Sequence, residues 1–417
     1  MSRMFSARPG HPVPGPYRSL FAVPAFRRLM PVFALSDLGD GMTVVAVAWL
    51  ALALGPEGGQ GTLAGVAVAA HVLPGALGAL VLGRWARRMT PRRLLVTDSA
   101  LRAVLLGAIP LGYLAGVLTP AVYVALLGAS SLLHAWGRAG KHALFAPLFT
   151  GERRVAANSV ISTSLWSATI AGPALAGLLA GAVSPVWIIG LDAVTFAVLA
   201  FRTSRTALPD GPPPAPSAGG AGEGIGFLRR RPELLGLLVI TWVFNFAFGP
   251  VEVGLPLFVS GELNAGPGLL GVYWAAFGTG GIIGALALGA ARRPPLWPAI
   301  LTIIAGHGVG LFAFAATGSA IPSLIGFTFA GLVYGPYAAL SFTLLQDRTP
   351  ARSLTTVLAA RNAVLLTASP LGAGLGGLLL DRSSAPAVLV GCGALMVLVA
   401  VVPALWGIRR RRLPAHA

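Results

Sequence analysis

Long apolar stretches recur along this chain, and each is long enough to cross a lipid bilayer. A hydrocarbon layer ~30 Å thick needs about 20 mostly apolar residues in an α-helix, because unpaired backbone groups are costly in lipid. We therefore expect an all-α polytopic membrane protein with twelve transmembrane helices. They are predicted at residues 29–54, 62–82, 94–116, 120–147, 156–181, 185–203, 234–259, 267–290, 296–316, 320–345, 354–380 and 385–407.

Composition agrees with a membrane location. Hydrophobic residues make up 55% of the chain and charged residues 10%, whereas a soluble chain carries about 25% charged residues. The 55 glycines and 33 prolines suit closely packed, kinked membrane helices. The one cysteine, Cys392, excludes an internal disulfide and a thiolate zinc cluster.

The net charge of +17 lies mostly in short segments beside the apolar stretches. This placement indicates a topology signal rather than a nucleic-acid surface. Arginines gather in every second connection and in both tails, while the opposite connections hold one basic residue, Arg382. The positive-inside rule therefore predicts a protein of the cell inner (cytoplasmic) membrane with both termini in the cytoplasm.

The chain divides into two halves of six predicted helices. We expect an N-terminal cytoplasmic tail at 1–28, a bundle at 29–203, a cytoplasmic linker at 204–233, a second bundle at 234–407 and a tail at 408–417. The fifth helix of each half contains a similar motif, Gly172–Gly177 in the first and Ser369–Gly374 in the second. This predicts a parallel repeat, with two six-helix bundles related by a pseudo-twofold axis.

Local motifs resemble those of the major facilitator superfamily. The 2/3 loop, Gly83–Arg93, is similar to the family's loop motif, although Arg87 and Thr90 replace its aspartate and second glycine. The segment Thr97–Ala103 resembles the helix 3 opening of the branch with the enterobactin exporter and macrolide-efflux proteins. Further similar motifs of that branch are Pro147–Leu148, Ala157–Asn158, Asp192–Phe196 and Leu345–Pro350.

The resemblance covers about residues 20–407 and implies the major facilitator fold. It also implies export of a small, amphipathic organic molecule, such as a drug, siderophore or natural product, by alternating access with proton antiport. The acid missing at position 87 removes the family's usual charge relay in that loop. An importer or facilitator of a nutrient stays open, as does a non-transporting membrane receptor or lipid flippase. We expect a monomer without a nucleic-acid partner.

Acidic residues inside helices are the candidates for proton coupling. A charge in a bilayer costs about 2.5–3.5 kcal/mol, so such residues usually line a cavity or pair with one another. Asp37 and Asp40 share one face of helix 1, and burial beside a like charge favours protonation near neutral pH. We expect Asp40, Asp37 and Glu252 to couple protons, with capping of a helix break or a gate position as the alternatives.

Helix 4 supplies a basic stripe of His134 and Arg138, continued by Lys141 or His142. The stripe is predicted to bind an anionic group or to neutralise Asp37 and Asp40, although interfacial anchoring is the favoured role of Lys141 and His142. The rest of the substrate site is predicted from polar and aromatic residues, with packing as the alternative for each aromatic: Asn245, Trp166, Trp242, Phe248, Trp274, Tyr334 and Tyr337. His307 is expected outside the cavity.

Other residues are assigned structural or conformational roles. Asp98 and Arg102 lie four apart, a spacing that predicts an intrahelical ion pair. Bending and close approach at the interface between the halves are assigned to Gly172, Pro173, Pro370 and Gly372. Arg361 is expected to face the cytoplasmic cavity or to pair with Asp347. The sequence lacks a phosphate loop and a catalytic serine elbow, so no enzyme, cofactor or metal site is predicted.

Overall fold

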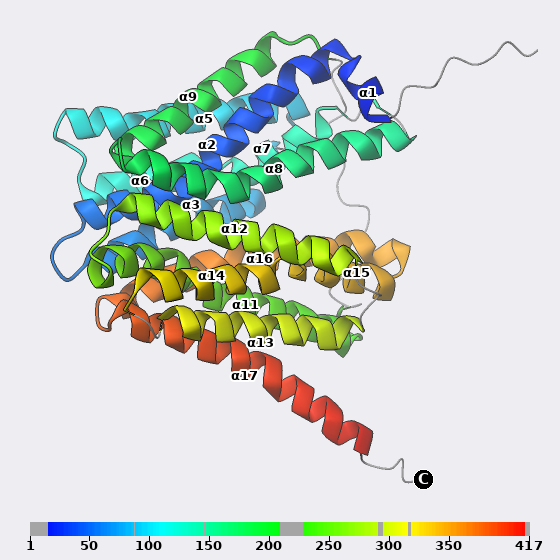
Figure 1. The fold of residues 1–417 in the computed structure, drawn as a ribbon. Helices are drawn as coiled ribbons and strands as arrows, with labels where there is room; N and C mark the ends of the chain where they lie inside the picture. The colour runs from blue at the N-terminus through cyan, green and yellow to red at the C-terminus, as the bar shows by residue number, and fades with distance from the viewer. Residues whose placement is uncertain are drawn as a thin grey trace, which may run out of the picture.

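The computed structural model describes residues 16–86, 88–145, 147–149, 151–208, 228–290, 295–315 and 318–412. Every regular element within these ranges is a helix (Figure 1). The first half contains α1 (Pro16–Phe21), α2 (Pro24–Leu54), α3 (Gln60–Val81), α4 (Gly83–Ala86), α5 (Pro91–Leu114), α6 (Pro120–Ser131), α7 (His134–Ala143), α8 (Gly151–Ala180) and α9 (Pro185–Arg205). The second contains α11 (Pro232–Leu257), the π-helical turn η1 (Phe258–Glu262), α12 (Pro267–Ala290), α13 (Leu296–Ala315), α14 (Ala320–Tyr334), α15 (Tyr337–Arg348), α16 (Ala351–Leu380) and α17 (Ala385–Arg412).

Helical structure occupies all twelve predicted stretches, which confirms the all-helical fold. Two of the stretches differ in detail, because predicted helices 4 and 10 are each broken near the middle. Pro336, which lacks an N–H donor, stands between α14 and α15. At the other break, the hydroxyl groups of Ser130 and Ser131 donate to the carbonyl oxygens of Leu127 and Gly128, a contact that tends to bend helices.

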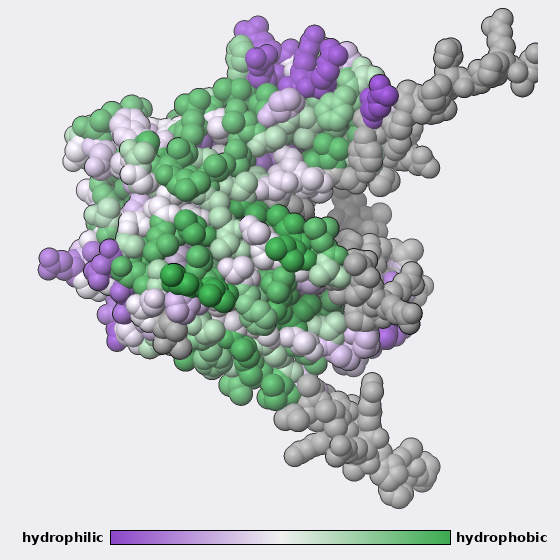
Figure 2. All heavy atoms as spheres, viewed as in Figure 1, coloured by the Kyte–Doolittle hydropathy of each residue, from purple (hydrophilic) through white to green (hydrophobic). Residues whose placement is uncertain are grey.

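The helix surface is suited to lipid. Ten helical segments of the described chain are long and apolar enough to cross a membrane. Large apolar side chains are exposed on the outer faces of these helices: the exposed fraction is 68% for Val104, 71% for Leu286 and 72% for Ile321. Figure 2 shows apolar residues over the middle of the helices and hydrophilic residues gathered near their ends. Such a surface is unfavourable in water, so this is a multi-pass membrane protein.

The helices form two groups, one of α1–α9 and one of α11–α17, which lie one above the other in Figure 1. The groups meet where α3 packs against α16 and α8 packs against α12. We call the end at which α1 begins and α17 ends the terminal end. The opposite end, which carries the connections 55–59, 263–266 and 381–384, is the loop end.

Glycines make the closest approaches between the two groups, near the loop end. A Cβ atom on Gly65 of α3 would lie 2.5 Å from the carbonyl oxygen of Ala373 in α16. A Cβ atom on Gly271 of α12 would lie 2.8 Å from the carbonyl oxygen of Ala174 in α8. The same contact therefore occurs twice, between equivalent helices of the two halves, as expected for a parallel repeat.

Gly172 and Gly372 pack within their own helix groups and not at this interface, which differs from the prediction for these two residues. A Cβ atom on Gly172 would lie 2.5 Å from the carbonyl carbon of Gly41, and Gly372 closes against the backbone of Phe246. Both contacts lie inside one helix group, α8 on α2 and α16 on α11. Pro173 and Pro370 are buried next to these glycines. Gly172 and Gly372 thus pack within their own halves, whereas Gly177 and Gly374 of the same motifs face α12 and α3 of the other half. The sequence alone does not distinguish these two roles.

A carboxylate also joins the two groups at the loop end. Asp381, which follows α16, accepts hydrogen bonds from the backbone N–H groups of Gly61 (2.8 Å) and Thr62 (2.9 Å) at the start of α3. These N–H groups have no partner within their own helix, and the helix dipole favours a negative charge there. Asp381 therefore caps a helix of the other group and helps to close this end.

Closure at the loop end should depend on the absence of a side chain at Gly65. We expect Gly65→Leu to push α3 away from α16 and to lower stability by about 1–3 kcal/mol, the usual cost of overpacking. The change is measured as a fall in the melting temperature of the purified protein in detergent. Gly236→Leu is the matched control, because no atom lies within 4 Å of a Cβ atom there. Equal melting temperatures for both variants would contradict this account.

Candidate functional site

Asp37 on α2 takes part in a buried ion pair. Its Oδ1 atom lies 2.5 Å from Nζ of Lys141 on α7, and its Oδ2 atom accepts a hydrogen bond of 2.8 Å from the Ser164 hydroxyl on α8. Both charged side chains are about nine-tenths buried. Since burial of an unpaired charge is very costly, each charge depends on the other for its place inside the helix group. Interfacial anchoring is therefore not the role of Lys141.

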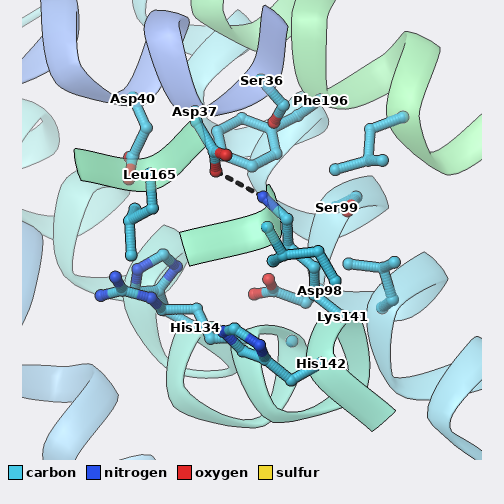
Figure 3. A pocket seen from close by; sticks show the side chains of 15 residues that line it. Ser36, Asp37, Asp40, Asp98, Ser99, His134, Lys141, His142, Leu165 and Phe196 are labelled. Carbon is cyan, nitrogen blue, oxygen red and sulfur yellow. Dashed lines mark hydrogen bonds and ion pairs between the residues drawn. The ribbon is translucent and has the colours of Figure 1, made fainter. Parts of the chain in front are cut away.

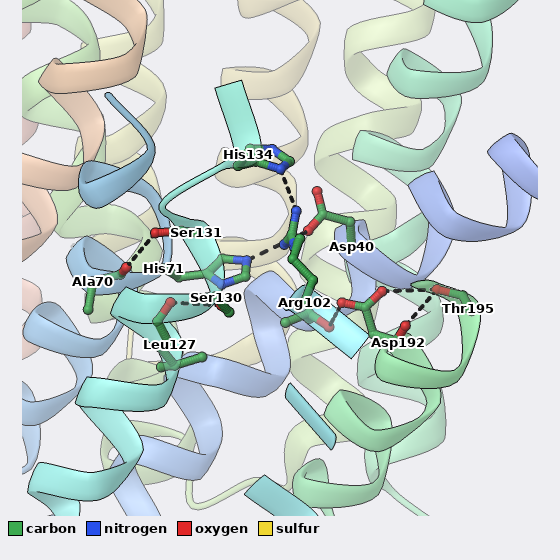
Figure 4. A network of polar contacts seen from close by, with 11 residues as sticks. Asp40, Ala70, His71, Arg102, Leu127, Ser130, Ser131, His134, Asp192 and Thr195 are labelled. Carbon is green, nitrogen blue, oxygen red and sulfur yellow. Dashed lines mark hydrogen bonds and ion pairs between the residues drawn. The ribbon is translucent and has the colours of Figure 1, made fainter. Parts of the chain in front are cut away.

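Asp40, one turn further along α2, is paired with Arg102 of α5. One guanidinium nitrogen of Arg102 donates to Oδ1 of Asp40 at 2.5 Å, and another donates to Nδ1 of His134 at 2.5 Å (Figure 4). The guanidinium also lies over the ring of Phe196, 4.2 Å from its centroid. Only 1% of the Arg102 side chain is exposed. A permanent charge this deep needs such a set of partners.

His71 of α3 completes the ring of groups around Asp40. Its Nε2 atom lies 3.7 Å from Oδ1 of Asp40, while its Nδ1 atom is buried without a partner among the described residues. Helices α2, α3, α5 and α7 thus each contribute one ionisable group to a single cluster. A cluster of this kind can accept or release a proton without exposing a charge to lipid.

The predicted intrahelical ion pair between Asp98 and Arg102 is not formed. Arg102 turns to Asp40 and His134 instead, and the Oδ1 atom of Asp98 is buried with no hydrogen-bond partner among the described residues. The spacing of four residues was compatible with a pair, but Asp40 on α2 competes for the same guanidinium. Long-range packing decides this competition, and sequence spacing does not reveal it.

Asp192 of α9 is a fully buried acid that sequence reasoning did not include in the site. Its carboxylate accepts hydrogen bonds from the hydroxyls of Thr43 (2.9 Å) and Thr195 (3.2 Å). His71 and Ser164 were missed as well. The available signal was weak: each is a polar residue in an otherwise apolar helix, and Asp192 lies in one of the family-like motifs.

A small polar cavity lies within the first helix group, lined by residues of α2, α5, α7, α8 and α9 (Figure 3). Its volume is about 40 Å³, and a water needs about 10–15 Å³ on this scale, so a few waters can fit. The apolar part of the wall comes from α5, α8 and α9, with Leu95, Leu165 and Phe196 among its residues. Its ionisable lining groups are Asp37, Asp40, Asp98, His134, Arg138, Lys141 and His142. Arg138 and His142 are exposed, whereas Lys141 is buried.

The second helix group presents a cluster of aromatic rings in its interior. Phe248 lies 6.0 Å from Tyr334 and 6.4 Å from Trp274, measured between ring centroids. The imidazole of His307 packs against Phe248 at 5.8 Å and Tyr334 at 5.6 Å and is fully buried. His307 therefore packs against two of the aromatic residues predicted for the substrate site.

The remaining predicted residues of this group are tied to nearby backbone and hydroxyl groups. The Tyr337 hydroxyl donates to Thr241, and the Asn245 amide donates to the Thr241 carbonyl. The Trp242 indole donates to Thr367 at 3.3 Å. The side chain of Trp166 lies outside the described residues, as does Arg87 of the 2/3 loop.

Glu252 of α11 is the one predicted acid in the second group. Its carboxylate accepts a hydrogen bond of 3.0 Å from the Ser369 hydroxyl on α16. Arg361 of α16 reaches Ser341 at 3.5 Å. Within the described ranges, no three His, Cys, Asp or Glu side chains gather as a metal site would require.

The buried pair of Asp37 and Lys141 gives a direct test of the charge network. We expect Lys141→Met to lower stability by about 3–5 kcal/mol, because it leaves a carboxylate buried without its cation. Adding Asp37→Asn should restore most of that loss, since the amide keeps a partner in Ser164. Thermal unfolding of the two single variants and the double variant measures the coupling. Additive losses would show that the ion pair does not stabilise this helix group.

Known proteins with similar sequences are membrane transporters. An uncharacterized MFS-type transporter, y4rN, of Sinorhizobium fredii is 30% identical over 93% of this chain and 96% of its own length. The multidrug efflux pump Tap of Mycobacterium tuberculosis is 28% identical and covers 94% of both chains. The enterobactin exporter EntS of Escherichia coli is 27% identical over 70% of this chain and 68% of its own.

Solved structures agree on the fold. A bacterial homologue of the human lysosomal transporter Spinster, in an inward-facing and occupied conformation, aligns with a TM-score of 0.69 at 14% identity over 96% of this chain and 99% of its own. The nucleoside transporter NupG aligns with a TM-score of 0.65 at 10% identity over 91% of this chain and 98% of its own. The model of the Major Facilitator Superfamily matches residues 29–368, so this chain belongs to that family of secondary transporters.

Proposed function

We propose that this transporter exports a small amphipathic organic molecule in exchange for protons. The observation that carries the proposal is the buried acid and base cluster around Asp40 and Arg102, beside a water-sized cavity. Burial of this many ionisable groups in a membrane protein is costly, and it is found where ions or protons are moved. The similarity to the multidrug efflux pump Tap and to the enterobactin exporter EntS supports the same direction of transport.

The two helix groups suit the two parts of an amphipathic cargo. The first group offers charged and polar atoms at Asp37, Arg138 and His134. The second offers the faces of Phe248, Trp274 and Tyr334, which accept many apolar shapes. A molecule held between them would present its polar part to the first group and its apolar part to the second.

Alternating access is the proposed mechanism. The glycine contacts and Asp381 hold the groups together at the loop end, so release of the cargo there requires these contacts to open. Asp40 would take up a proton and loosen its hold on Arg102, which frees α2 and α5 to move relative to each other. Asp37 and Glu252 are the further proposed proton carriers.

The proposed setting is the inner membrane, with the arginine-rich terminal end in the cytoplasm. Arg27, Arg28, Arg202 and Arg205 lie near this end on α2 and α9, in agreement with the positive-inside rule. Export then means movement from the terminal end to the loop end. We propose that the monomer is the working unit, since each helix group completes its own core.

Asp40→Asn tests the coupling. The amide cannot take up a proton as the carboxyl does, so we expect a pH gradient to drive transport at less than about one-tenth of the wild-type rate, as when a positioned acid or base is lost. Transport is measured in proteoliposomes with ethidium and with any compound that raises the melting temperature of the purified protein. Binding of that compound should persist.

Asp40→Glu is the matched control and should keep part of the pH-driven transport, because it retains the acid. Wild-type rates in Asp40→Asn would remove Asp40 from the mechanism. Export is separated from nutrient import in cells that lack the protein. The exporter reading predicts that these cells accumulate the compound, and loss of the compound instead would support an importer.

A further inference from the structure

The cavity of the first helix group contains an acidic residue, Asp98, that takes part in neither of the two buried ion pairs. Arg102 and Lys141 are the two buried basic side chains with permanent charge in the described part of this group. Each is already bonded to an acid of α2, Arg102 to Asp40 and Lys141 to Asp37. Asp98 lines the same cavity, is only 3% exposed, and has one carboxylate oxygen without a hydrogen-bond partner among the described residues.

Neighbouring residues pack closely around Asp98 and fix its position. Helix α7 passes so close that a Cβ atom on Gly137 would lie 2.6 Å from the Cβ atom of Asp98, so only a glycine leaves room there. Figure 3 shows the Asp98 carboxylate turned toward the cavity, between His134 and Lys141. Asp98 is seven residues from the start of α5 at Pro91, about 10 Å along the helix. It therefore lies between the terminal end and the deeper Asp40 cluster.

The charged groups that face Asp98 come from three helices. Arg102 lies on its own helix, Asp37 and Asp40 on α2, and His134, Arg138, Lys141 and His142 on α7. Among these, Arg102 is four residues away on the same face of α5, within reach after a change of rotamer. One guanidinium is thus placed between two carboxyl groups, and in this structure it is bonded to Asp40.

We propose that Asp98 is a proton-binding site that shares Arg102 with Asp40. In the conformation described, Asp98 is the neutral acid and Asp40 the carboxylate paired with Arg102. In the alternate state, the proton leaves Asp98 for a cavity water, Arg102 swings to the new carboxylate, and Asp40 takes up a proton in place of its ion pair. One proton and one guanidinium are exchanged between two carboxyl groups, and the number of buried charges stays constant.

This inference rests on the proposed proton coupling, which it deepens by naming a second carrier. It explains why the Oδ1 atom of Asp98 lacks a partner, since a buried neutral acid is far less costly than a buried unpaired carboxylate. It also gives the cavity a role. A few waters there would connect Asp98 with Asp40, because both carboxyl groups line the same cavity.

Infrared difference spectroscopy tests the proton on Asp98 without any cargo. The reconstituted full-length protein is shifted from neutral to alkaline pH, and the C=O band of protonated carboxyl groups is compared between wild type and Asp98→Asn. We expect the variant to lose the intensity of one carboxylic acid. Asp98→Glu should keep that intensity at a shifted frequency, and it serves in place of Asp98→Asn if the amide variant fails to fold. An unchanged band in either variant would overturn the proposal.

Transport in the same proteoliposomes separates this proposal from the proposed function. With ethidium as the probe, Asp98→Asn should lose at least tenfold in uphill transport driven by a pH gradient but keep downhill exchange. A purely structural Asp98 predicts equal effects on both, and that outcome would also refute the proton site. If transport by the wild-type protein does not respond to the pH gradient, the proposal of proton antiport is refuted. The infrared comparison still decides whether Asp98 holds a proton.

Discussion

Arg102 keeps its positive charge deep within the first helix group, and the cost of that burial constrains everything packed around it. A lone guanidinium is strongly unfavourable in a medium of low polarity, so α2, α7 and α9 bring Asp40, His134 and the ring of Phe196 to it. The pair of Asp37 and Lys141 obeys the same rule one turn away. Because these bonds join different helices, a change in protonation at one of them changes how the helices fit together.

The two halves share a scaffold but not a chemistry. Equivalent glycines bring α3 to α16 and α12 to α8, and both long central helices, four and ten in the predicted order, break near their middle. The first half fills its interior with ion pairs, whereas the second uses Phe248, Tyr334 and His307. The two halves thus have the same helix arrangement but different interior residues. The first half offers groups for polar recognition and proton coupling, and the second offers apolar contacts, as an amphipathic cargo requires.

The sequence predicts the helices well, because bilayer thickness and backbone hydrogen bonding leave few other solutions. It also identifies Asp37, Asp40 and His134 as interior residues. It cannot predict which partner each one takes: Arg102 could bond Asp98 or Asp40, and the tertiary structure chooses the latter. Gly172 and Gly372 were misplaced for a similar reason, since spacing within a helix does not say which neighbour that helix face meets.

The central claim is that proton and cargo binding are linked through the buried cluster. This linkage is tested most directly by adding to the purified protein, in weakly buffered solution, a compound that raises the melting temperature of the protein. The measured quantity is the number of protons released or taken up for each molecule bound. We expect a pH-dependent change of about one proton per bound molecule, because linked sites must respond to each other. Cargo binding with no proton exchanged at any pH between mildly acidic and mildly alkaline would contradict it.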